Sequence, residues 1–364
     1  GRIVNADLDD PAELQYTRDH IDWDNIIDYT AFNIFSCNYD WPWNNVRYWN
    51  SEEYDGKWRW IPHDLDWTFG EYGSMAKTNS MDVVLHPDSS DFSMLFHKLS
   101  QNEEFRNKFI NRTADLMNSR FLYDSLLNAL NIIAGGVDSE MSRARKKHGY
   151  IYEKWSDEVD KIRYFIVDRA AEIRKHYIKK YDCGETAYIN LNTNYDDGCE
   201  IEINSLCLNE FPWQGIYYTD VPVRIKALSS EGYKFVKWSD STLPATAEVS
   251  VNLPRVYELT AIFEKTDTVD SNTCSSLFPS VYPNPASDAC LIKFYTDENT
   301  RISINVFDLN GRKVATPVED KTYNAGMHIA LFNTDSCSQG SYLCVLKNLE
   351  TGEIIHTITI IVKR

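Results

Sequence analysis

The feature that most constrains the fold is a change in hydrophobic periodicity near Cys183. Before this residue, apolar side chains recur at helical spacing, as in residues 26–35 and 155–181. After it, apolar and polar residues alternate in short runs separated by turn residues, which is the pattern of half-buried strands. Because 364 residues exceed one typical domain, the sequence predicts a multidomain α+β chain with its helices first and its strands last.

Shifts in composition set the predicted boundaries. The predicted parts are a helical domain at 1–182, a small all-β module at 183–265, a polar linker at 266–280 and a second all-β module at 281–364. Strands of the middle module are expected at 187–191, 221–227, 235–238, 249–253 and 257–263. Taken alone, the strands of the last module indicate an immunoglobulin-like β-sandwich. Aromatic residues of the middle module are interpreted as packing residues rather than a carbohydrate platform; they are Trp213, Tyr217 and Tyr218.

Capping residues mark the helices of the first domain. Asp22 or Asp24 is placed to cap the helix at 26–35, and Asn102 to cap another. A helix at 122–133 is expected to stop at the glycine pair 135–136.

Charge and apolar runs exclude several classes of partner. The net charge of −17 argues against binding to nucleic acid or anionic lipid and fits a soluble exported protein. The sequence contains no run of 18 or more apolar residues, so it predicts no transmembrane helix. The basic run 143–148 is interpreted as a solvated helix face.

Residues 1–7 do not resemble a signal peptide and position 1 is not Met, so we expect a processed or engineered fragment.

The eight cysteines include no C-x-x-C pair, which argues against a zinc site. Their even number in an exported chain permits disulfides, and the local candidates are Cys199–Cys207 and Cys337–Cys344. Buried free thiols are the alternative.

The candidate active site comes from one aromatic stretch of the helical domain. Asp40, Asn45 and Asp64 flank two short aromatic runs, 46–49 and 57–61, which are separated by a turn-like segment. This pattern predicts a β-hairpin. Since the two ends of a hairpin are neighbours in space, we expect the three side chains to face one pocket.

Protein kinases use this layout. An Asp orients the substrate hydroxyl, an Asn five residues later holds one Mg²⁺, and an Asp beyond a hairpin holds the other. Carboxylate and amide oxygens suit such hard cations. Residues 38–40 with Asn45, and residues 60–70, resemble the CotH family of kinase-like spore-coat and surface proteins. Residues 102–116 and 155–181 resemble the end of the same family.

The resemblance implies a helical protein-kinase-like C-lobe with a β-hairpin. It implies Asp40 as the catalytic carboxylate, Asn45 and Asp64 as metal ligands that also contact the nucleotide, and Asp66 as an accessory ligand. His63 stands where the family often has Trp. The implied cofactors are Mg²⁺ (or Mn²⁺) and ATP, and the implied partner is a protein with a Ser, Thr or Tyr hydroxyl.

One departure bears on activity. A kinase needs a Gly-rich loop and a strand Lys upstream, yet the 39 residues before Asp40 contain no Lys. We therefore expect the full-length protein to be an active atypical kinase and this chain alone to be weak or inactive. The alternative is a kinase-like scaffold that has lost catalytic activity and acts as a surface binding or structural protein. Structural Ca²⁺ binding by the acidic cluster is a third hypothesis.

Two further resemblances lie in the β modules. Residues 232–238, followed by the strand at 257–263, resemble internalin-type B-repeat modules of bacterial surface proteins. Residues 281–364 resemble the C-terminal sorting domain of type IX secretion cargo, found in Bacteroidetes. The quoted pieces are 282–286, 302–308, the turn at 309–312, 340–346 and 354–362. The resemblance implies a protein secreted or held at the outer cell surface, with the type IX machinery as a partner.

Overall fold

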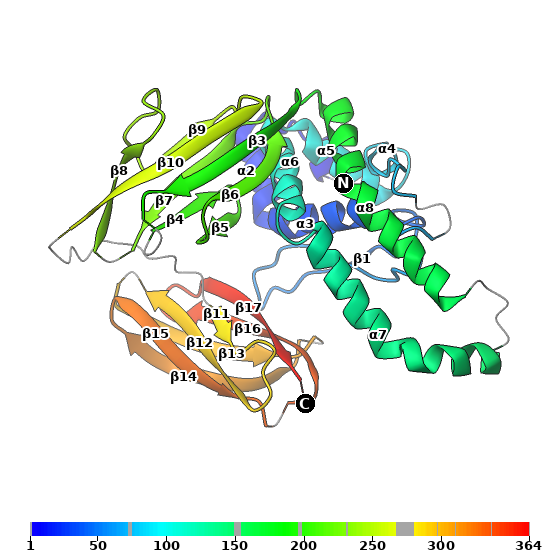
Figure 1. Ribbon diagram of the computed structural model, residues 1–364. Coiled ribbons are helices and arrows are strands. Elements are labelled where there is room, and N and C mark those ends of the chain that lie inside the picture. The colour runs from blue at the N-terminus through cyan, green and yellow to red at the C-terminus, as the bar shows by residue number, and fades with distance from the viewer. Residues whose placement is uncertain are drawn as a thin grey trace. The chain divides into compact units, whose positions relative to one another are not determined.

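The chain is both helical and β-rich, and it divides into two compact units. The computed structural model describes residues 2–71, 75–148, 154–195, 199–230, 232–266, 280–296, 298–309, 311–335 and 337–363. The units are Gly1–Ser271 and Asn272–Arg364. Helices precede the large sheets along the chain (Figure 1), so the predicted mixed α+β class is confirmed. Most of the predicted linker, residues 267–279, lies outside the described residues.

The first unit begins with the helices and one hairpin. The helices are α1 (Arg2–Asn5), α2 (Pro11–His20), α3 (Trp23–Ser36), α4 (Met81–Val84), α5 (Asp91–Gln101), α6 (Glu103–Met117), α7 (Tyr123–His148) and α8 (Trp155–Tyr181). Side-chain caps form as predicted, because Asp22 accepts from the amide of Asn25 at the start of α3 and Asn102 accepts from the amide of Phe105 at the start of α6.

The prediction of a helix end at Gly135 and Gly136 is wrong, because α7 runs through both residues to His148. Neither glycine has a positive φ, so neither forms the left-handed end that a C-cap requires. Helix interiors tolerate glycine at a cost of about 1 kcal/mol each. The basic residues that follow lie in the last turn, where cations suit the helix dipole.

Two four-stranded sheets complete the first unit. Their strand orders are β6-β3-β10-β8 and β5-β4-β7-β9, and the β3–β10 pair is parallel. The strands are β3 (Thr186–Thr193), β4 (Cys199–Ile203), β5 (Leu206–Leu208), β6 (Trp213–Tyr218), β7 (Val223–Ser229), β8 (Tyr233–Trp238), β9 (Glu248–Val251) and β10 (Val256–Lys265). The five predicted strands are present, and β4, β5 and β6 are additional.

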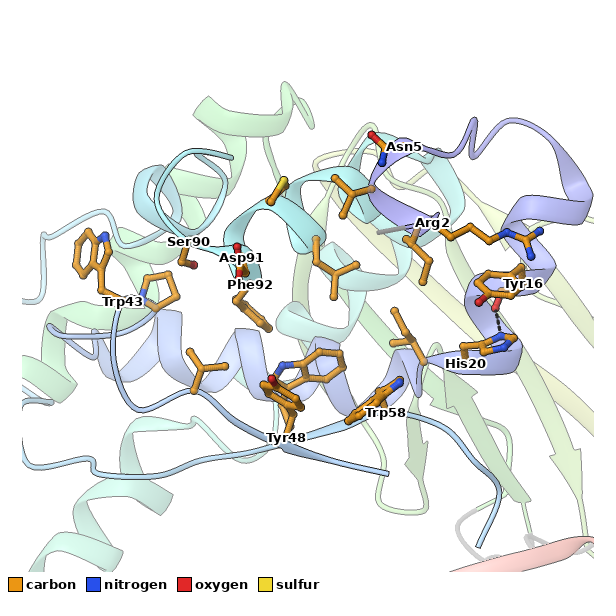
Figure 2. A pocket seen from close by; sticks show the side chains of 18 residues that line it. Arg2, Asn5, Tyr16, His20, Trp43, Tyr48, Trp58, Ser90, Asp91 and Phe92 are labelled. Atoms are coloured by element: carbon orange, nitrogen blue, oxygen red, sulfur yellow. Dashed lines mark hydrogen bonds between the residues drawn. The ribbon is translucent and has the colours of Figure 1, made fainter. Parts of the chain in front are cut away.

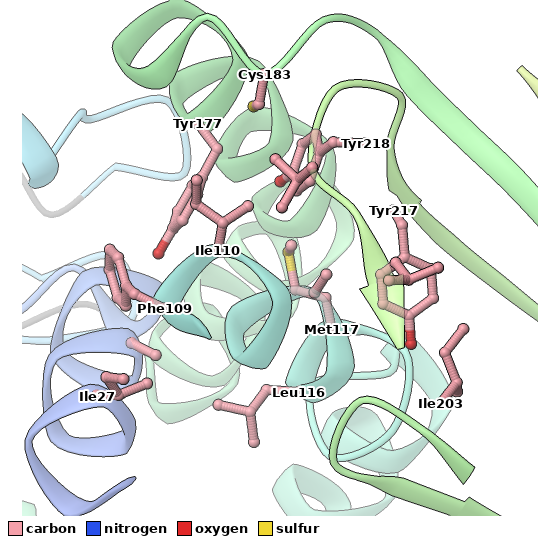
Figure 3. Close-up of a cluster of buried hydrophobic side chains, with 14 of the residues drawn as sticks. Ile27, Phe109, Ile110, Leu116, Met117, Tyr177, Cys183, Ile203, Tyr217 and Tyr218 are labelled. Carbon is pink, nitrogen blue, oxygen red and sulfur yellow. The ribbon is translucent and has the colours of Figure 1, made fainter. Parts of the chain in front are cut away.

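Helices and sheets of the first unit share one hydrophobic core. Tyr177 of α8 stacks with Tyr218 of β6 at 6.3 Å between ring centroids, and Ile110 of α6 is buried in the same cluster (Figure 3). Tyr217 and Tyr218 are buried, as expected of packing residues. The predicted boundary at residue 182 therefore marks a change of secondary structure, while contacts group both parts into one compact unit.

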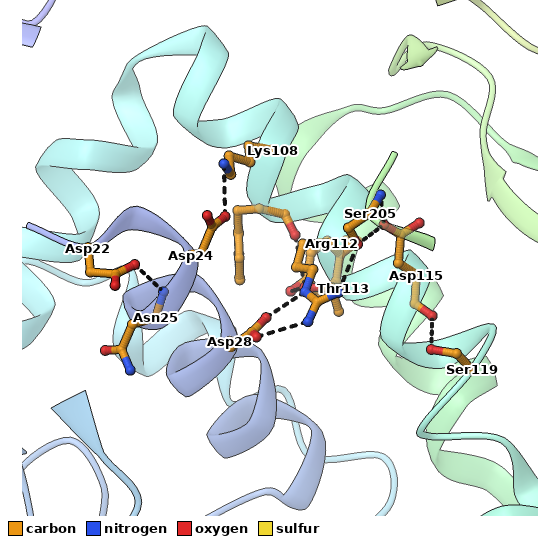
Figure 4. Close-up of polar contacts among 12 residues, drawn as sticks. Asp22, Asp24, Asn25, Asp28, Lys108, Arg112, Thr113, Asp115, Ser119 and Ser205 are labelled. Carbon is orange, nitrogen blue, oxygen red and sulfur yellow. Dashed lines mark hydrogen bonds and ion pairs between the residues drawn. The ribbon is translucent and has the colours of Figure 1, made fainter. Parts of the chain in front are cut away.

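A buried carboxylate fastens α6 to the β4–β5 turn (Figure 4). Asp115 accepts hydrogen bonds from the amide of Ser205 at 2.9 Å and from the hydroxyl of Tyr217 at 2.7 Å. Nearby, Arg112 donates two hydrogen bonds to Asp28 at 2.6 and 2.9 Å, which ties α6 to α3. These contacts orient α3, the helix that leads into the candidate site.

The second unit consists of two antiparallel sheets with orders β11-β12-β15 and β14-β13-β16-β17. The strands are β11 (Ser280–Tyr282), β12 (Ala289–Thr296), β13 (Thr300–Phe307), β14 (Lys313–Tyr323), β15 (Gly326–Asn333), β16 (Gly340–Asn348) and β17 (Ile354–Val362). Inward-facing residues of both sheets form one core, which includes Ile292, Phe294, Ile304, Val306 and Ile360. The predicted strands near β13, β16 and β17 are present. The predicted turn at 309–312 includes residue 310, which lies outside the described residues.

The seven cysteines that the structure describes are free thiols, and Cys274 lies outside the described residues. Cys199 is buried, whereas Cys207 is exposed and pairs across the ladder with Glu202. Because side chains alternate between the two faces of a strand, positions 199 and 202 of β4 point in opposite directions, and Cys207 shares the face of position 202. This register keeps the two thiols apart. Cys337 and Cys344 are buried free thiols as well.

Candidate active site

The candidate catalytic loop follows a rigidly held helix. The left-handed residue Cys37 ends α3, and its amide donates to the carbonyls of Asn33 and Ile34. The side chain of Asn38 then donates to the side chain of Asn33 at 3.0 Å. Most of α3 is buried. The contacts of Cys37 and Asn38 therefore fix the direction in which the chain leaves this helix, just before Asp40.

A buried arginine of α8 supports the same point. Arg169 is fully buried and donates to the carbonyls of Phe35 at 2.8 Å, Ala76 at 2.6 Å and Thr78 at 2.8 Å, with a further hydrogen bond to Ile34. Burial lowers the pKa of Arg169 to about 10. The guanidinium thus joins the end of α3 to the segment that follows the hairpin and the acidic loop.

The predicted hairpin is present as β1 (Arg47–Trp49) and β2 (Arg59–Ile61), which pair antiparallel. It is held against α3 by Asn25, whose side chain donates to the carbonyl of Trp60 at 3.2 Å and accepts from its amide at 2.6 Å. Arg59 also bridges Asp22 at 2.8 Å and Asp55 at 2.6 Å. These contacts fix the position of the residues that leave β2 toward Asp64.

The structure brings Asp40, Asn45 and Asp64 to one cavity of about 510 Å³. The amide nitrogen of Asn45 donates to Oδ2 of Asp40 at 2.7 Å, while Oδ1 of Asp40 is buried and has no hydrogen-bond partner. Asn45 and Asp64 both adopt left-handed φ values, 59° and 56°. Such conformations are uncommon outside glycine and concentrate at functional sites. The expectation of a shared pocket is therefore correct in its geometry.

Burial and neighbouring negative charge raise the pKa of Asp40. Desolvation is the largest cause, and the carboxylates of Asp64 and Asp66 add to it, although hydrogen bonds to the carboxylate from the backbone and Asn45 act in the opposite direction. The described residues contain no cluster of three or more His, Cys, Asp or Glu side chains arranged to hold a metal ion. The oxygen-bearing side chains that line this cavity thus include the amides of Asn44 and Asn45 as well as the carboxylates of Asp40 and Asp64.

Asp66 lines a different cavity, of about 270 Å³, with Thr68 and Gly70 and with residues of α7 and α8. It influences Asp40 through its charge, and its predicted role as a metal ligand stays a prediction. His63 lies exposed beside Asp64.

Sequence analysis did not single out three residues of the site. Trp43, Asn44 and Arg47 line the cavity together with Asp40. Arg47 is exposed on β1, only two residues beyond Asn45. A cation at the start of an otherwise aromatic strand is the sequence feature that could have indicated its place in the site. Its guanidinium supplies positive charge to a cavity that otherwise holds carboxylates.

These observations define a two-part class of protein: an α+β unit with an acid–amide–acid cavity, followed by a two-sheet β unit. Residues 2–173 match the family described as CotH kinase protein, and residues 280–363 match the secretion system C-terminal sorting domain. The first part of the chain is thus similar to the CotH family, and the last part carries a sorting domain of the type IX secretion system. Both resemblances are confirmed, while the internalin-type resemblance of the middle module stays a prediction.

Solved structures add little. A dimeric latent PorU from Porphyromonas gingivalis is 11% identical, with a TM-score of 0.23, and the match covers 49% of this chain and 18% of that chain. The multi-modular glycogen-degrading pneumococcal virulence factor SpuA is 8% identical, with a TM-score of 0.18, and the match covers 47% of this chain and 26% of that chain. TM-scores this low support no inference about the fold. No curated protein matches the chain.

The sorting domain indicates export to the cell surface or secretion, and it implies the type IX machinery as a partner. Among the described residues, none of the helices has the length and apolar character needed to cross a membrane.

Proposed function

We propose that this chain carries the catalytic and metal-binding side chains of a CotH-like atypical protein kinase. The reaction is Mg²⁺-dependent transfer of the γ-phosphoryl group of ATP to a hydroxyl of an exported protein. One observation carries the proposal: Asp40, Asn45 and Asp64 line a single cavity although the hairpin separates Asp64 from the other two along the chain. In finer detail, we propose that the helical part is a kinase-like C-lobe and that the last unit is an immunoglobulin-like β-sandwich. Its resemblance to type IX sorting domains suggests a source among the Bacteroidetes.

The donor set fits a hard divalent cation. Magnesium prefers carboxylate and amide oxygens and keeps part of its shell for water and phosphate. The side chains of Asn45 and Asp64 supply such oxygens in the cavity, and the carboxylates of Asp64 and Asp66 add to the burial that raises the pKa of Asp40. The bound cation, with Mn²⁺ as a substitute, would neutralise charge on the transferred phosphoryl group.

Asp40 acts on the acceptor. Asn45 holds its Oδ2 in place, and the carboxylate takes the proton of the acceptor hydroxyl. The acceptor oxygen forms the new bond to the γ-phosphorus while the bond from that phosphorus to the bridging oxygen breaks, and ADP keeps the electron pair. Arg47, on the same cavity wall, is placed to pair with phosphate oxygens.

A second candidate is a retired kinase scaffold that serves as a surface binding or structural protein. It is favoured by the cavity lining, because among the residues that the structure describes Arg47 is the lining cation and no lysine contributes. Kinases use a lysine to hold the nucleotide phosphates. Structural Ca²⁺ binding at the carboxylates is a third reading, and calcium calorimetry tests it.

The test is transfer of radiolabelled phosphate from ATP to protein acceptors, with the present chain and a longer chain that includes upstream sequence. We expect magnesium-dependent transfer by the longer chain, and loss of at least a hundredfold in Asp40→Asn and Asp64→Asn. Asp138→Asn, an exposed carboxylate on α7, serves as the control. Unchanged magnesium- and ATP-dependent behaviour in Asp64→Asn would favour the scaffold instead.

A further inference from the structure

An apolar groove of about 850 Å³ adjoins the candidate active site (Figure 2). Its walls come from α1, α2, the hairpin, the start of α5 and the loop that contains Pro42 and Trp43. Three of its aromatic side chains are solvent-exposed: Trp43 at 55%, Tyr48 at 61% and Trp58 at 39%. Exposed aromatic surface of this kind, gathered in a concave site, marks a place where a ligand binds.

The groove is continuous with the catalytic cavity. Trp43 and Val46 line both, and these two residues belong to the same loop as Asp40 and Asn45. A ligand that presents a hydroxyl at Asp40 therefore meets the groove on the adjoining wall without crossing another element.

The ring geometry suits a bulky apolar side chain. Tyr48 and Trp58 meet edge-to-face at 68° with centroids 5.5 Å apart, and Trp60 and Phe92 meet at 70° with centroids 5.8 Å apart. Edge-to-face pairs turn their faces in different directions, so they form a three-dimensional pocket rather than a flat stacking platform. A bulky apolar side chain, branched or aromatic, fits into the depth of such a pocket.

Cations at the groove are already engaged within the chain. Arg2 donates to Glu13 at 2.7 Å, and its guanidinium lies 3.7 Å from the ring centroid of Tyr16. His20 stacks on the same tyrosine ring at 3.8 Å, and its Nδ1 is 2.9 Å from the carbonyl oxygen of Tyr16. Binding in the groove therefore does not require an anionic ligand, and it is driven by apolar contact.

We propose that this groove seats a large apolar or aromatic side chain of the polypeptide acceptor, at a fixed number of residues from the hydroxyl that Asp40 receives. The inference rests on the proposed function, because it assigns the substrate of the same site. In an extended peptide, successive side chains point to opposite sides, so one side chain enters the groove while another stands at the cavity. The groove thus determines which hydroxyls are selected.

The experiment measures binding of fluorescent peptides to the full chain by anisotropy, without nucleotide. Each peptide has one central serine, and each flanking position in turn carries Phe, Leu, Ala or Glu. We expect Phe or Leu at one fixed offset to bind about tenfold more tightly than Ala. Tyr48→Ala and Trp58→Ala should lose this preference. Tyr164→Ala, which removes a still more exposed tyrosine on α8 outside the groove, should keep it.

Equal binding of all peptides, or a preference that both groove variants retain, would overturn the inference. Displacement of the Phe peptide by adenosine alone would also overturn it, because the groove would then take the nucleobase. Phosphate transfer to the same peptides, catalysed by the longer chain, is scored separately. Selective binding without transfer supports the groove and counts against the proposed function. Transfer without any apolar preference supports the function and refutes the groove.

Discussion

Replacement of Arg169 by Met is the most informative structural perturbation near the site. Arg169 donates to four backbone carbonyls, from α3 and from residues 76 and 78. A hydrogen bond from a charged group contributes about 1.5–3 kcal/mol, so the four bonds contribute about 6–12 kcal/mol before the cost of keeping the guanidinium from water. That cost is several kcal/mol, and it is the reason why the pKa of Arg169 falls to about 10. We expect Arg169→Met to lower the free energy of unfolding by about 3–5 kcal/mol.

The same helix offers a matched control in Arg174. Burial lowers its pKa too, but its Nε is buried without a hydrogen-bond partner. Because this arginine bears the cost of desolvation with fewer compensating bonds, Arg174→Met should change stability by less than about 1 kcal/mol.

Urea unfolding followed by tryptophan fluorescence measures the difference. All ten tryptophans lie in the first unit, so the signal reports that unit alone. Equal m-values would show that the comparison is one of stability and not of the extent of unfolding. If Arg169→Met costs no more than Arg174→Met, the carbonyl contacts do not hold the end of α3, and the reasoning is refuted.

Two further predictions concern the supports of the site. Asn25→Ala removes both hydrogen bonds to the backbone of Trp60 and should cost about 1–3 kcal/mol in the same unfolding assay, and an unchanged midpoint would show that the hairpin is held by packing alone. Burial raises the pKa of Asp115 despite its bonds to Ser205 and Tyr217, so the folded state binds this proton more tightly than the unfolded state. The stability of the wild type relative to Asp115→Asn should therefore be greatest in acid and fall as the pH rises through the folded-state pKa, and a rise with pH would contradict the burial argument.

Local signals predicted the parts of the fold that depend on neighbouring residues. Asp22 caps α3 because its side chain reaches an amide three residues away, and that pattern is visible in the sequence. The hairpin with Tyr48 opposite Trp60 follows from two aromatic runs around a turn. The shared cavity followed from the hairpin, since its ends are neighbours in space.

Other features depend on residues far apart in the sequence. Asp115 is buried on α6, and its partners Ser205 and Tyr217 lie 90 and 102 residues further along the chain. No local pattern identifies such a carboxylate. The glycines at 135 and 136 predict a helix end by local propensity, yet α7 runs through both to His148. The role of Arg47 was missed because a cavity wall is a property of the fold and not of a strand pattern.

The central claim is that Asp40, Asn45 and Asp64 bind one cation together. Its most direct test is titration of the chain with Mn²⁺, followed by electron paramagnetic resonance, in wild type, Asp64→Asn and Asp138→Asn. We expect a Mn²⁺ site in the wild type that Asp64→Asn weakens at least tenfold and Asp138→Asn leaves unchanged. Equal affinity in wild type and Asp64→Asn, or no Mn²⁺ binding by the wild type, would contradict the claim.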